Sequence, residues 1–393
     1  MQPRPIQLVM FLAIFSALTA LLHYYLWHRL VRSPELGATF ARVGTRTLIG
    51  LALLLPAGIL AARVLPRSAA SVVAWTSFLW FGVAVVLFFL LVTSEFVRGA
   101  VHAASAIGVA GPMDPERRQF LSRAIAAGVG GLGMLVSGVG IASARGAVGI
   151  EKVAVKLRRF PAKLAGFRIV QVSDLHIGAT IGKDWLEDVV ARVNAEQPDI
   201  VAITGDLVDG SVADLADQTS PLANLRAKHG VYFVTGNHEY YSGADEWIAY
   251  LQTLGVRVLR NEHVEIGEGD HTFHLAGVDD FASRRWPGHG PDLEKALSGR
   301  DTSKEVVLLA HQPKQIFEAV NHGVGLQLSG HTHGGQIYPW GYMVKLDQPH
   351  LQGLERRGDT QIYTSRGTGY WGPPMRVGVP SEISVIELHP ETA

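Results

Sequence analysis

The side chains of this 393-residue chain that could do chemistry gather in short clusters in its second half. Five such clusters contain aspartate, histidine or asparagine, in four of them together with glycine or proline, and they occupy residues 173–176, 204–209, 236–239, 310–313 and 330–335. A single Asp-x-His or Gly-Asp pair is typical of an ordinary loop. Five clusters in succession, each after an apolar run, instead indicate that several strands contribute ligands to one metal site.

The residue types in these clusters favour a site for two cations. Asp174 and His176 are two residues apart, so in an extended segment they point the same way. A carboxylate such as Asp206 can bridge two ions about 3.5–4 Å apart, as two-metal hydrolases require, and Asn237 offers a neutral oxygen. Mixed carboxylate, imidazole and amide ligands suit Mn, Fe or Zn better than Mg or Ca.

The elements that must position these clusters follow from the pattern after residue 167. Short β-rich runs predict strands at 167–172, 200–204, 231–235, 306–310, 325–329, 362–365 and 383–388. Amphipathic windows predict helices at 183–196, 213–227, 244–254 and 314–320. Gly205, Gly236 and Gly330 would let the backbone turn sharply where strands end. We therefore predict layered sheets flanked by helices, with the site beyond the strands' carboxyl ends.

With every cluster in this order, residues 167–388 resemble the calcineurin-like metallophosphoesterases. The resemblance implies an α/β fold, a four-layer αββα sandwich at residues 146–393. It implies one divalent ion held by Asp174, His176, Asp206 and His333, and a second held by Asp206, Asn237, His311 and His331. His238 would stabilise the transition state or protonate the leaving oxygen, which makes His238 and Asp206 the implied catalytic residues. A hydroxide between the two ions would attack phosphorus in line.

A Gly-rich segment near the C-terminus, residues 364–369, carries Arg366. This arginine could clamp a substrate phosphate bidentately; the alternative is a solvated side chain in a turn. Together with residues 334–336, the segment is similar to the membrane-associated branch of the family, which includes bacterial transmembrane phosphoesterases. Two long irregular stretches, 281–291 and 337–352, contain tryptophan or tyrosine. These aromatic side chains could receive a lipid or a base, or simply pack their loops.

The first part of the chain has a different composition. Of all residues 48% are hydrophobic and 18% charged, and the apolar excess lies before residue 145. Four apolar stretches, at about 6–27, 47–64, 70–92 and 125–143, predict an α-helical membrane region of three to four transmembrane helices at residues 1–145. The formal net charge is zero, so nothing indicates a nucleic-acid partner. The absence of cysteine excludes disulfides and thiolate metal sites.

Charge placement predicts the orientation of a multi-pass protein of the cell membrane. Two loops are rich in arginine: Arg29, Arg32, Arg42 and Arg46 in one, and Arg98, Arg117, Arg118 and Arg123 in the other. Such loops favour the cytoplasm, which places the catalytic domain on the extracytoplasmic side. Residues 116–122 resemble a twin-arginine export signal, and 142–144 match a signal-peptidase site. The alternative is an ordinary fourth helix, and a basic cluster at 152–163 argues for the opposite orientation.

The leading hypothesis is a membrane-anchored two-metal phosphodiesterase or pyrophosphatase. A membrane tether suggests a lipid-linked or nucleotide-linked substrate, such as a phospholipid or UDP-diacylglucosamine. The resemblance implies the second, because members of the resembled branch cleave its pyrophosphate. That glycolipid is cytoplasmic, which conflicts with the outward orientation. The competing hypothesis is a catalytically silent membrane sensor that uses the same fold for binding. Such sensors normally lose metal ligands, and this sequence retains every one.

Overall fold

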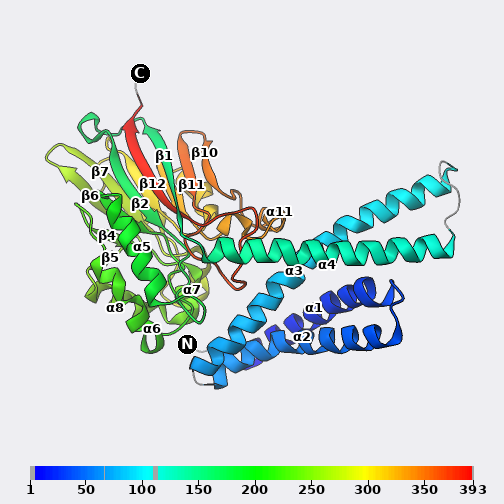
Figure 1. Ribbon diagram of the computed structural model, residues 1–393. Helices are drawn as coiled ribbons and strands as arrows, with labels where there is room; N and C mark the ends of the chain where they lie inside the picture. The colour runs from blue at the N-terminus through cyan, green and yellow to red at the C-terminus, as the bar shows by residue number, and fades with distance from the viewer. Residues whose placement is uncertain (1–4, 66, 109–113, 392–393) are drawn as a thin grey trace. The chain divides into compact units, whose positions relative to one another are not determined.

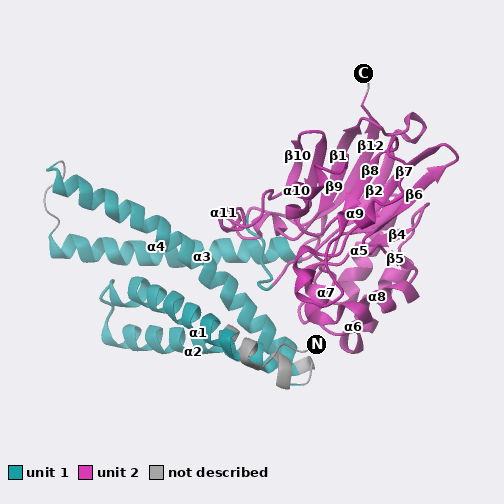
Figure 2. Ribbon diagram, turned by 180° about the vertical axis from the view of Figure 1, so that it is seen from behind, with its two compact units in different colours: residues 1–145, 372–377 teal, residues 146–371, 378–393 magenta. Residues whose placement is uncertain are grey.

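A computed structural model describes residues 5–65, 67–108 and 114–391 of the chain. It divides into two compact units (Figure 2): Met1–Arg145 with Gly372–Val377, and Gly146–Trp371 with Gly378–Ala393. The extreme ends of the predicted ranges 1–145 and 146–393, together with residues 66 and 109–113, lie outside the described residues.

The first unit is helical, as predicted. Its long helices are α1 (Pro5–Trp27), α2 (Ala38–Val64), α3 (Arg67–Ala106) and α4 (Pro115–Arg145). Within the described residues, three stretches are long and apolar enough to cross a membrane: Ala38–Ala61, Ala69–Ala106 and Pro115–Arg145. The predicted stretch 6–27 forms α1. The helices run beyond the predicted spans because their polar ends continue the same backbone hydrogen bonding.

Side chains inside the helical unit pack in a small cluster. Leu26 of α1 and Leu91 of α3 are fully buried, and they belong to the same cluster as Val129 of α4. Outward-facing side chains such as Leu53 and Val139 are about two thirds exposed, at 65% and 63%. A helix that shows apolar side chains to its surroundings as well as to its neighbours is typical of a membrane environment.

The second unit contains two six-stranded sheets. Their strands are β1 (Gly149–Leu157), β2 (Phe167–Val172), β3 (Ile200–Ile203), β4 (Val231–Phe233), β5 (Val256–Val258), β6 (Glu262–Glu268), β7 (His271–Gly277), β8 (Val306–Leu309), β9 (Leu326–Ser329), β10 (Gly353–Arg357), β11 (Thr360–Thr364) and β12 (Glu382–Pro390). The strand orders are β1-β12-β2-β3-β4-β5 and β10-β11-β9-β8-β7-β6. Strands β2 to β5 are parallel, as are β7, β8, β9 and β11, so their carboxyl ends lie at one edge of each sheet.

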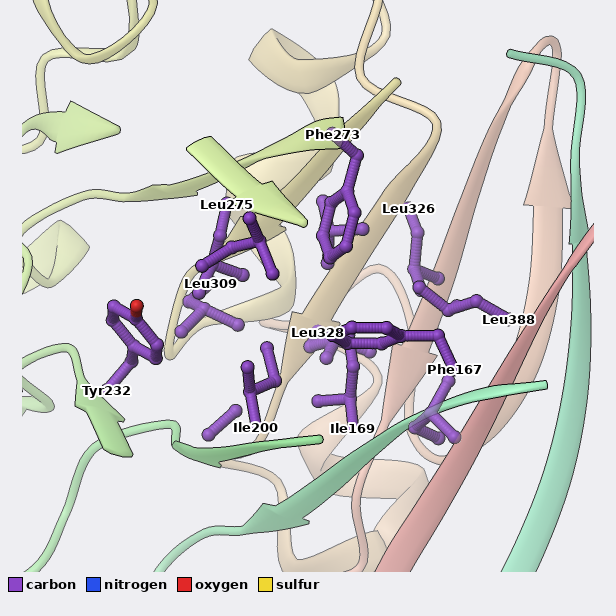
Figure 3. Close-up of a cluster of buried hydrophobic side chains, with 14 of the residues drawn as sticks. Phe167, Ile169, Ile200, Tyr232, Phe273, Leu275, Leu309, Leu326, Leu328 and Leu388 are labelled. Carbon is purple, nitrogen blue, oxygen red and sulfur yellow. The ribbon is translucent and has the colours of Figure 1, made fainter. Parts of the chain in front are cut away.

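The main hydrophobic core lies between the two sheets (Figure 3). Phe167 and Ile169 of β2 alternate onto this face, and the Phe167 ring meets Phe273 edge-on with centroids 5.2 Å apart. Leu309 and Leu328 supply the opposite side from β8 and β9. Each such side chain stabilises the fold by about 1.5–3 kcal/mol when fully buried. This core fixes the distance between the strand ends that carry the clusters.

Helices cover the outer faces of the sheets, so the predicted four-layer α/β architecture is confirmed (Figure 1). The longer helices are α5 (Lys183–Ala195), α6 (Val212–Thr219) and α8 (Ala244–Thr253), and the single-turn or two-turn helices are α7 (Asn237–Ser242), α9 (Leu293–Ala296), α10 (Ile316–Ala319) and α11 (Gly341–Val344). On the second sheet, α9 and α10 share a separate buried cluster with β8. The predicted helix 213–227 is shorter than expected, because the chain changes to a 3₁₀ turn at Ser220–Asn224, which contains Pro221.

Candidate metal centre

The predicted ligand residues all follow strands at the carboxyl edges of the two sheets. Strand β2 leads to Asp174 and His176, β3 leads to Asp206, and β4 leads to Asn237, the first residue of α7. The second sheet contributes three histidines after β8 and β9, namely His311, His331 and His333. The structure therefore brings residues far apart in the sequence to one location, although which of them bind metal stays a prediction.

One group of candidate ligands consists of Asp174, His176 and His333. The two histidine Nε2 atoms face each other at 3.1 Å, and His333 Nε2 lies 3.4 Å from Asp174 Oδ1. All three residues are buried. The backbone N–H of His331 also donates to both oxygens of Asp174, at 3.0 and 3.1 Å, which fixes the carboxylate.

A second group consists of Asp206, His311 and His331. His311 Nε2 lies 3.0 Å from Asp206 Oδ2 and 3.2 Å from His331 Nδ1. Asp206 Oδ2 is also 4.0 Å from His176 Nε2 in the first group. Asp206 is thus the carboxylate between the two groups, the position that a bridging ligand requires.

Two observations fit divalent cations at these groups. Pairs of imidazole nitrogens converge at hydrogen-bond distance inside a buried site, an arrangement in which a shared cation can replace a proton. In addition, Asn237 Oδ1 is buried and has no hydrogen-bond partner within the described part of the chain. A buried amide oxygen without a donor is costly unless something else binds it. The donor set of carboxylate, imidazole and amide suits Mn, Fe or Zn.

Five of the candidate ligands have a left-handed backbone. Their φ angles are 56° for Asp174, 49° for His176, 51° for Asp206, 71° for His331 and 50° for His333. Residues other than glycine adopt this conformation at a cost of about 1–3 kcal/mol each, and mostly where function requires it. The concentration of strain on these residues indicates that the strand ends are shaped to aim their side chains at one point.

Most glycines near the site matter because they let backbone segments lie close to neighbouring residues, and fewer of them are needed for a sharp backbone turn. A Cβ on Gly236 would lie 2.2 Å from Asp206 Oδ1, and one on Gly330 would lie 1.9 Å from Ser173 Oγ. Gly236 has φ −98°, an ordinary value, whereas Gly205 has φ +87°. The expectation of a sharp turn thus applies to Gly205, while Gly236 is needed because no side chain fits beside Asp206.

Two acidic residues support the candidate ligands. Asp209 Oδ2 lies 3.2 Å from His176 Nδ1, and Asp209 Oδ1 lies 2.5 Å from His238 Nδ1. Because a carboxylate only accepts hydrogen bonds, both Nδ1 atoms carry the proton and their Nε2 atoms face the site. Glu239 is fully buried and accepts from the backbone N–H groups of Asp206, Leu207, Val208 and Gly236. It therefore orients the Asp206 loop directly, through backbone N–H groups.

The electrostatics of the cluster keep one acid ionised and one histidine neutral. Burial raises the pKa of Asp206, but the neighbouring His311 and His238 lower it by more, so that this pKa lies well below its usual range. Burial and His311 lower the pKa of His331 to about 3. Burial lowers the pKa of His238, but Asp206 and Asp209 raise it more, to about 9. An ionised carboxylate and a neutral imidazole are the forms that bind cations, whereas a protonated His238 can donate to an oxyanion.

Arg366 lies in ion pairs. Its guanidinium contacts Glu382 and, at 2.8 Å, Glu151 Oε2. Its Cγ is 3.1 Å from the point where a Cβ of Gly334 would lie, so its stem borders the loop that carries His333. The interpretation of Arg366 as a phosphate clamp stays a prediction.

Aromatic side chains outside the predicted ligand clusters border His238. The rings of Tyr241 and Trp371 lie 5.5 and 5.7 Å from the His238 ring. Trp286 in turn lies 5.7 Å from Tyr241. Tyr241 and Trp371 are 60% and 54% exposed, so they form an open apolar rim. Of the three, only Trp286 lies in a stretch whose aromatic content the sequence indicated, because Tyr241 belongs to α7 and Trp371 follows β11.

Comparisons with known proteins agree with this geometry. Residues 167–335 match the family model described as calcineurin-like phosphoesterase. An uncharacterized metallophosphoesterase of Helicobacter pylori (strain J99) is 44% identical over 226 residues, which cover 57% of this chain and 60% of that protein.

Two further relatives extend the comparison. The transmembrane protein with metallophosphoesterase domain of Bos taurus is 38% identical over 317 residues, covering 77% of this chain and 71% of that protein. An uncharacterized metallophosphoesterase of Aquifex aeolicus is 36% identical over 243 residues, covering 61% of this chain and 91% of that protein. By sequence and by the family model, this chain is a member of the calcineurin-like metallophosphoesterase family.

Proposed function

We propose that the chain is a membrane-anchored phosphodiesterase or pyrophosphatase that uses two divalent ions, Mn, Fe or Zn. The observation that carries the proposal is the convergence of two histidine pairs, one buried and one partly buried, each at 3.1–3.2 Å, on either side of Asp206. In this proposal the residues that hold the ions are Asp174, His176, Asp206, Asn237, His311, His331 and His333. Bound ions of this kind lower the pKa of coordinated water and neutralise charge on phosphoryl oxygens.

The protein's own residues supply positioning and a proton. Asp209 holds His238 through Nδ1, so His238 Nε2 points into the site, 3.9 Å from Asp206 Oδ2. The hydrogen bond to Asp209 favours the protonated form of this imidazole. His238 is therefore suited to donate a proton to the leaving oxygen, or to stabilise charge on phosphorus oxygens.

We further propose a lipid-linked or nucleotide-linked substrate, such as a phospholipid or UDP-diacylglucosamine, and an extracytoplasmic catalytic domain at residues 146–393. Membrane anchoring favours an amphiphilic substrate, and the two arginine-rich loops favour the outward orientation. Export by the twin-arginine-like segment at 116–122 belongs to the same proposal. A cytoplasmic glycolipid substrate would require the opposite orientation, so protease treatment of intact cells decides between these two parts of the proposal.

The hydrolytic activity is tested with the full chain, purified in detergent, depleted of metal and reloaded with Mn²⁺. We expect hydrolysis of bis-p-nitrophenyl phosphate. Replacing His238 with glutamine should lower kcat by about 10²–10⁴-fold, the usual contribution of a general acid. The matched control is His271→Gln, because His271 lies on β7 outside every candidate ligand group. A metal-loaded protein that hydrolyses none of the phosphoesters offered would support the silent sensor instead.

A further inference from the structure

A group of exposed apolar side chains in the second unit lies on the segment 338–346, which we call the aromatic loop. It contains α11, and five of its large side chains are exposed: Tyr338 (63%), Trp340 (47%), Tyr342 (64%), Met343 (52%) and Leu346 (80%). Scattered apolar side chains are normal on a protein surface, but a contiguous group of this size marks an interaction site.

The aromatic loop is held rigidly at both ends. Before it, the Gln336 side chain exchanges two hydrogen bonds of 3.0 Å with the backbone of Trp371, and Ile337 is buried. After it, the buried Gln348 donates to Gln312 Oε1 at 3.2 Å. The exposed tip is therefore preorganised, and exposure of its side chains is not a result of a loose chain.

The same loop is continuous with the metal centre. Gly335 has φ +86°, and a Cβ there would lie 2.4 Å from the Gly341 Cα, so the loop folds back tightly on its own start. Only one residue separates Gly335 from His333. Whatever the tip binds is consequently held close to the candidate ligands.

Chain connectivity restricts the second unit to the neighbourhood of a membrane. Helix α4 ends at Arg145 and β1 begins at Gly149. The intervening residues can span only about 10 Å. A second tether is the segment Gly372–Val377, which belongs to the helical unit, where the Arg376 N–H donates to the Gly140 carbonyl at 2.9 Å. Trp371, which Gln336 binds, directly precedes this segment.

The chemistry of the tip fits the surface of a bilayer. Tyrosine and tryptophan combine an apolar ring with a polar edge and concentrate at the membrane interface, while Met343 and Leu346 are suited to the acyl boundary. Lys345 is exposed and adds a positive charge for anionic headgroups. The single carboxylate that follows, Asp347, is paired with Lys314 at 2.6 Å, so it does not oppose insertion.

We propose that the aromatic loop inserts into the headgroup region of a lipid bilayer, as a membrane contact additional to the transmembrane helices, and so presents the metal centre to the membrane surface. The proposal does not depend on hydrolysis. It would give the enzyme direct access to phosphoesters of membrane lipids.

The natural absence of cysteine permits a direct test. The full chain carrying Leu346→Cys is labelled with an environment-sensitive fluorophore and reconstituted into vesicles of phosphatidylcholine and phosphatidylglycerol. The control is Asp270→Cys at the exposed turn between β6 and β7. We expect blue-shifted emission at position 346, and quenching by lipids labelled near the headgroup several-fold stronger than at position 270.

Two results would overturn the proposal. Solvent-like emission at 346 with quenching no greater than at 270 would show that the loop faces water. Blue-shifted emission without quenching by lipid would show that protein, either the helical unit or a second copy of the chain, covers the loop. Either outcome would leave the proposed hydrolysis unaffected, because the measurement involves no turnover.

Discussion

Glu239 offers the sharpest test of how the metal centre is supported. Its side chain is fully buried on α7 and binds the backbone of two loops. Oε1 accepts from Leu207 N at 2.8 Å and Val208 N at 3.4 Å, while Oε2 accepts from Gly236 N at 2.6 Å and Asp206 N at 3.0 Å. Replacement by glutamine preserves the shape but turns one of these oxygens into an NH₂ group that faces N–H donors.

The expected cost follows from the bonds lost. Two backbone N–H groups lose their acceptor, and each buried donor left without an acceptor costs about 1–3 kcal/mol. Glu239→Gln should therefore destabilise the fold by about 3 kcal/mol or more. For a domain of this size, each kcal/mol lowers the melting temperature by roughly 2–4 °C, so we expect a decrease of about 6–12 °C.

The assay is thermal unfolding of the full chain in detergent, measured once without metal and once after loading with Mn²⁺. The matched control is Glu187→Gln, because Glu187 is exposed on α5 and loses only its charge. If Glu239→Gln melts within about 2 °C of the control, the backbone contacts of Glu239 contribute less than one hydrogen bond, and our reasoning about its role is wrong.

Three further predictions concern the same loops. Asp209→Asn removes an acceptor shared by His176 and His238, and should lower metal affinity or activity by about 10–100-fold, measured by Mn²⁺ titration and turnover. Gly236→Ala should abolish metal binding, because its Cβ would lie 2.2 Å from Asp206 Oδ1; unchanged metal content would contradict the close-approach argument. Treatment with EDTA should stop phosphoester hydrolysis and Mn²⁺ should restore it, whereas activity that survives complete metal removal would exclude a metal-dependent reaction.

The parts of the fold that the sequence predicted best are its buried parallel strands. β2 was predicted with its observed bounds, because four of its six residues, FRIVQV, are aromatic or β-branched. β6 was missed, since its sequence alternates apolar residues with glutamate and histidine, which lowers its apparent strand propensity. β1, β5, β7 and β10 also escaped prediction. β1 and β10 are edge strands with largely exposed side chains, β5 has only three residues, and β7 contains two histidines although it is mostly buried.

The candidate ligands were identifiable from the sequence, because metal-binding residue types follow several predicted strands. The residues that hold these ligands in place were not identifiable in this way. Asp209 contacts the rings of His176 and His238, whereas Glu239 binds backbone N–H groups instead. The role of Glu239 depends on how closely the loop after β3 approaches α7, a tertiary distance that no local pattern encodes. Likewise, the ion pairs of Arg366 with Glu151 and Glu382 join residues far apart in the sequence.

The central claim is that one carboxylate joins two cation sites, and metal stoichiometry tests it most directly. The full chain loaded with Mn²⁺ is measured by elemental analysis beside Asp206→Asn and the exposed control Asp270→Asn. We predict about two ions per chain in the natural protein and the control, as expected for a two-metal site, and a loss of at least one ion together with turnover in Asp206→Asn. Retention of both ions and full activity by Asp206→Asn would contradict the account.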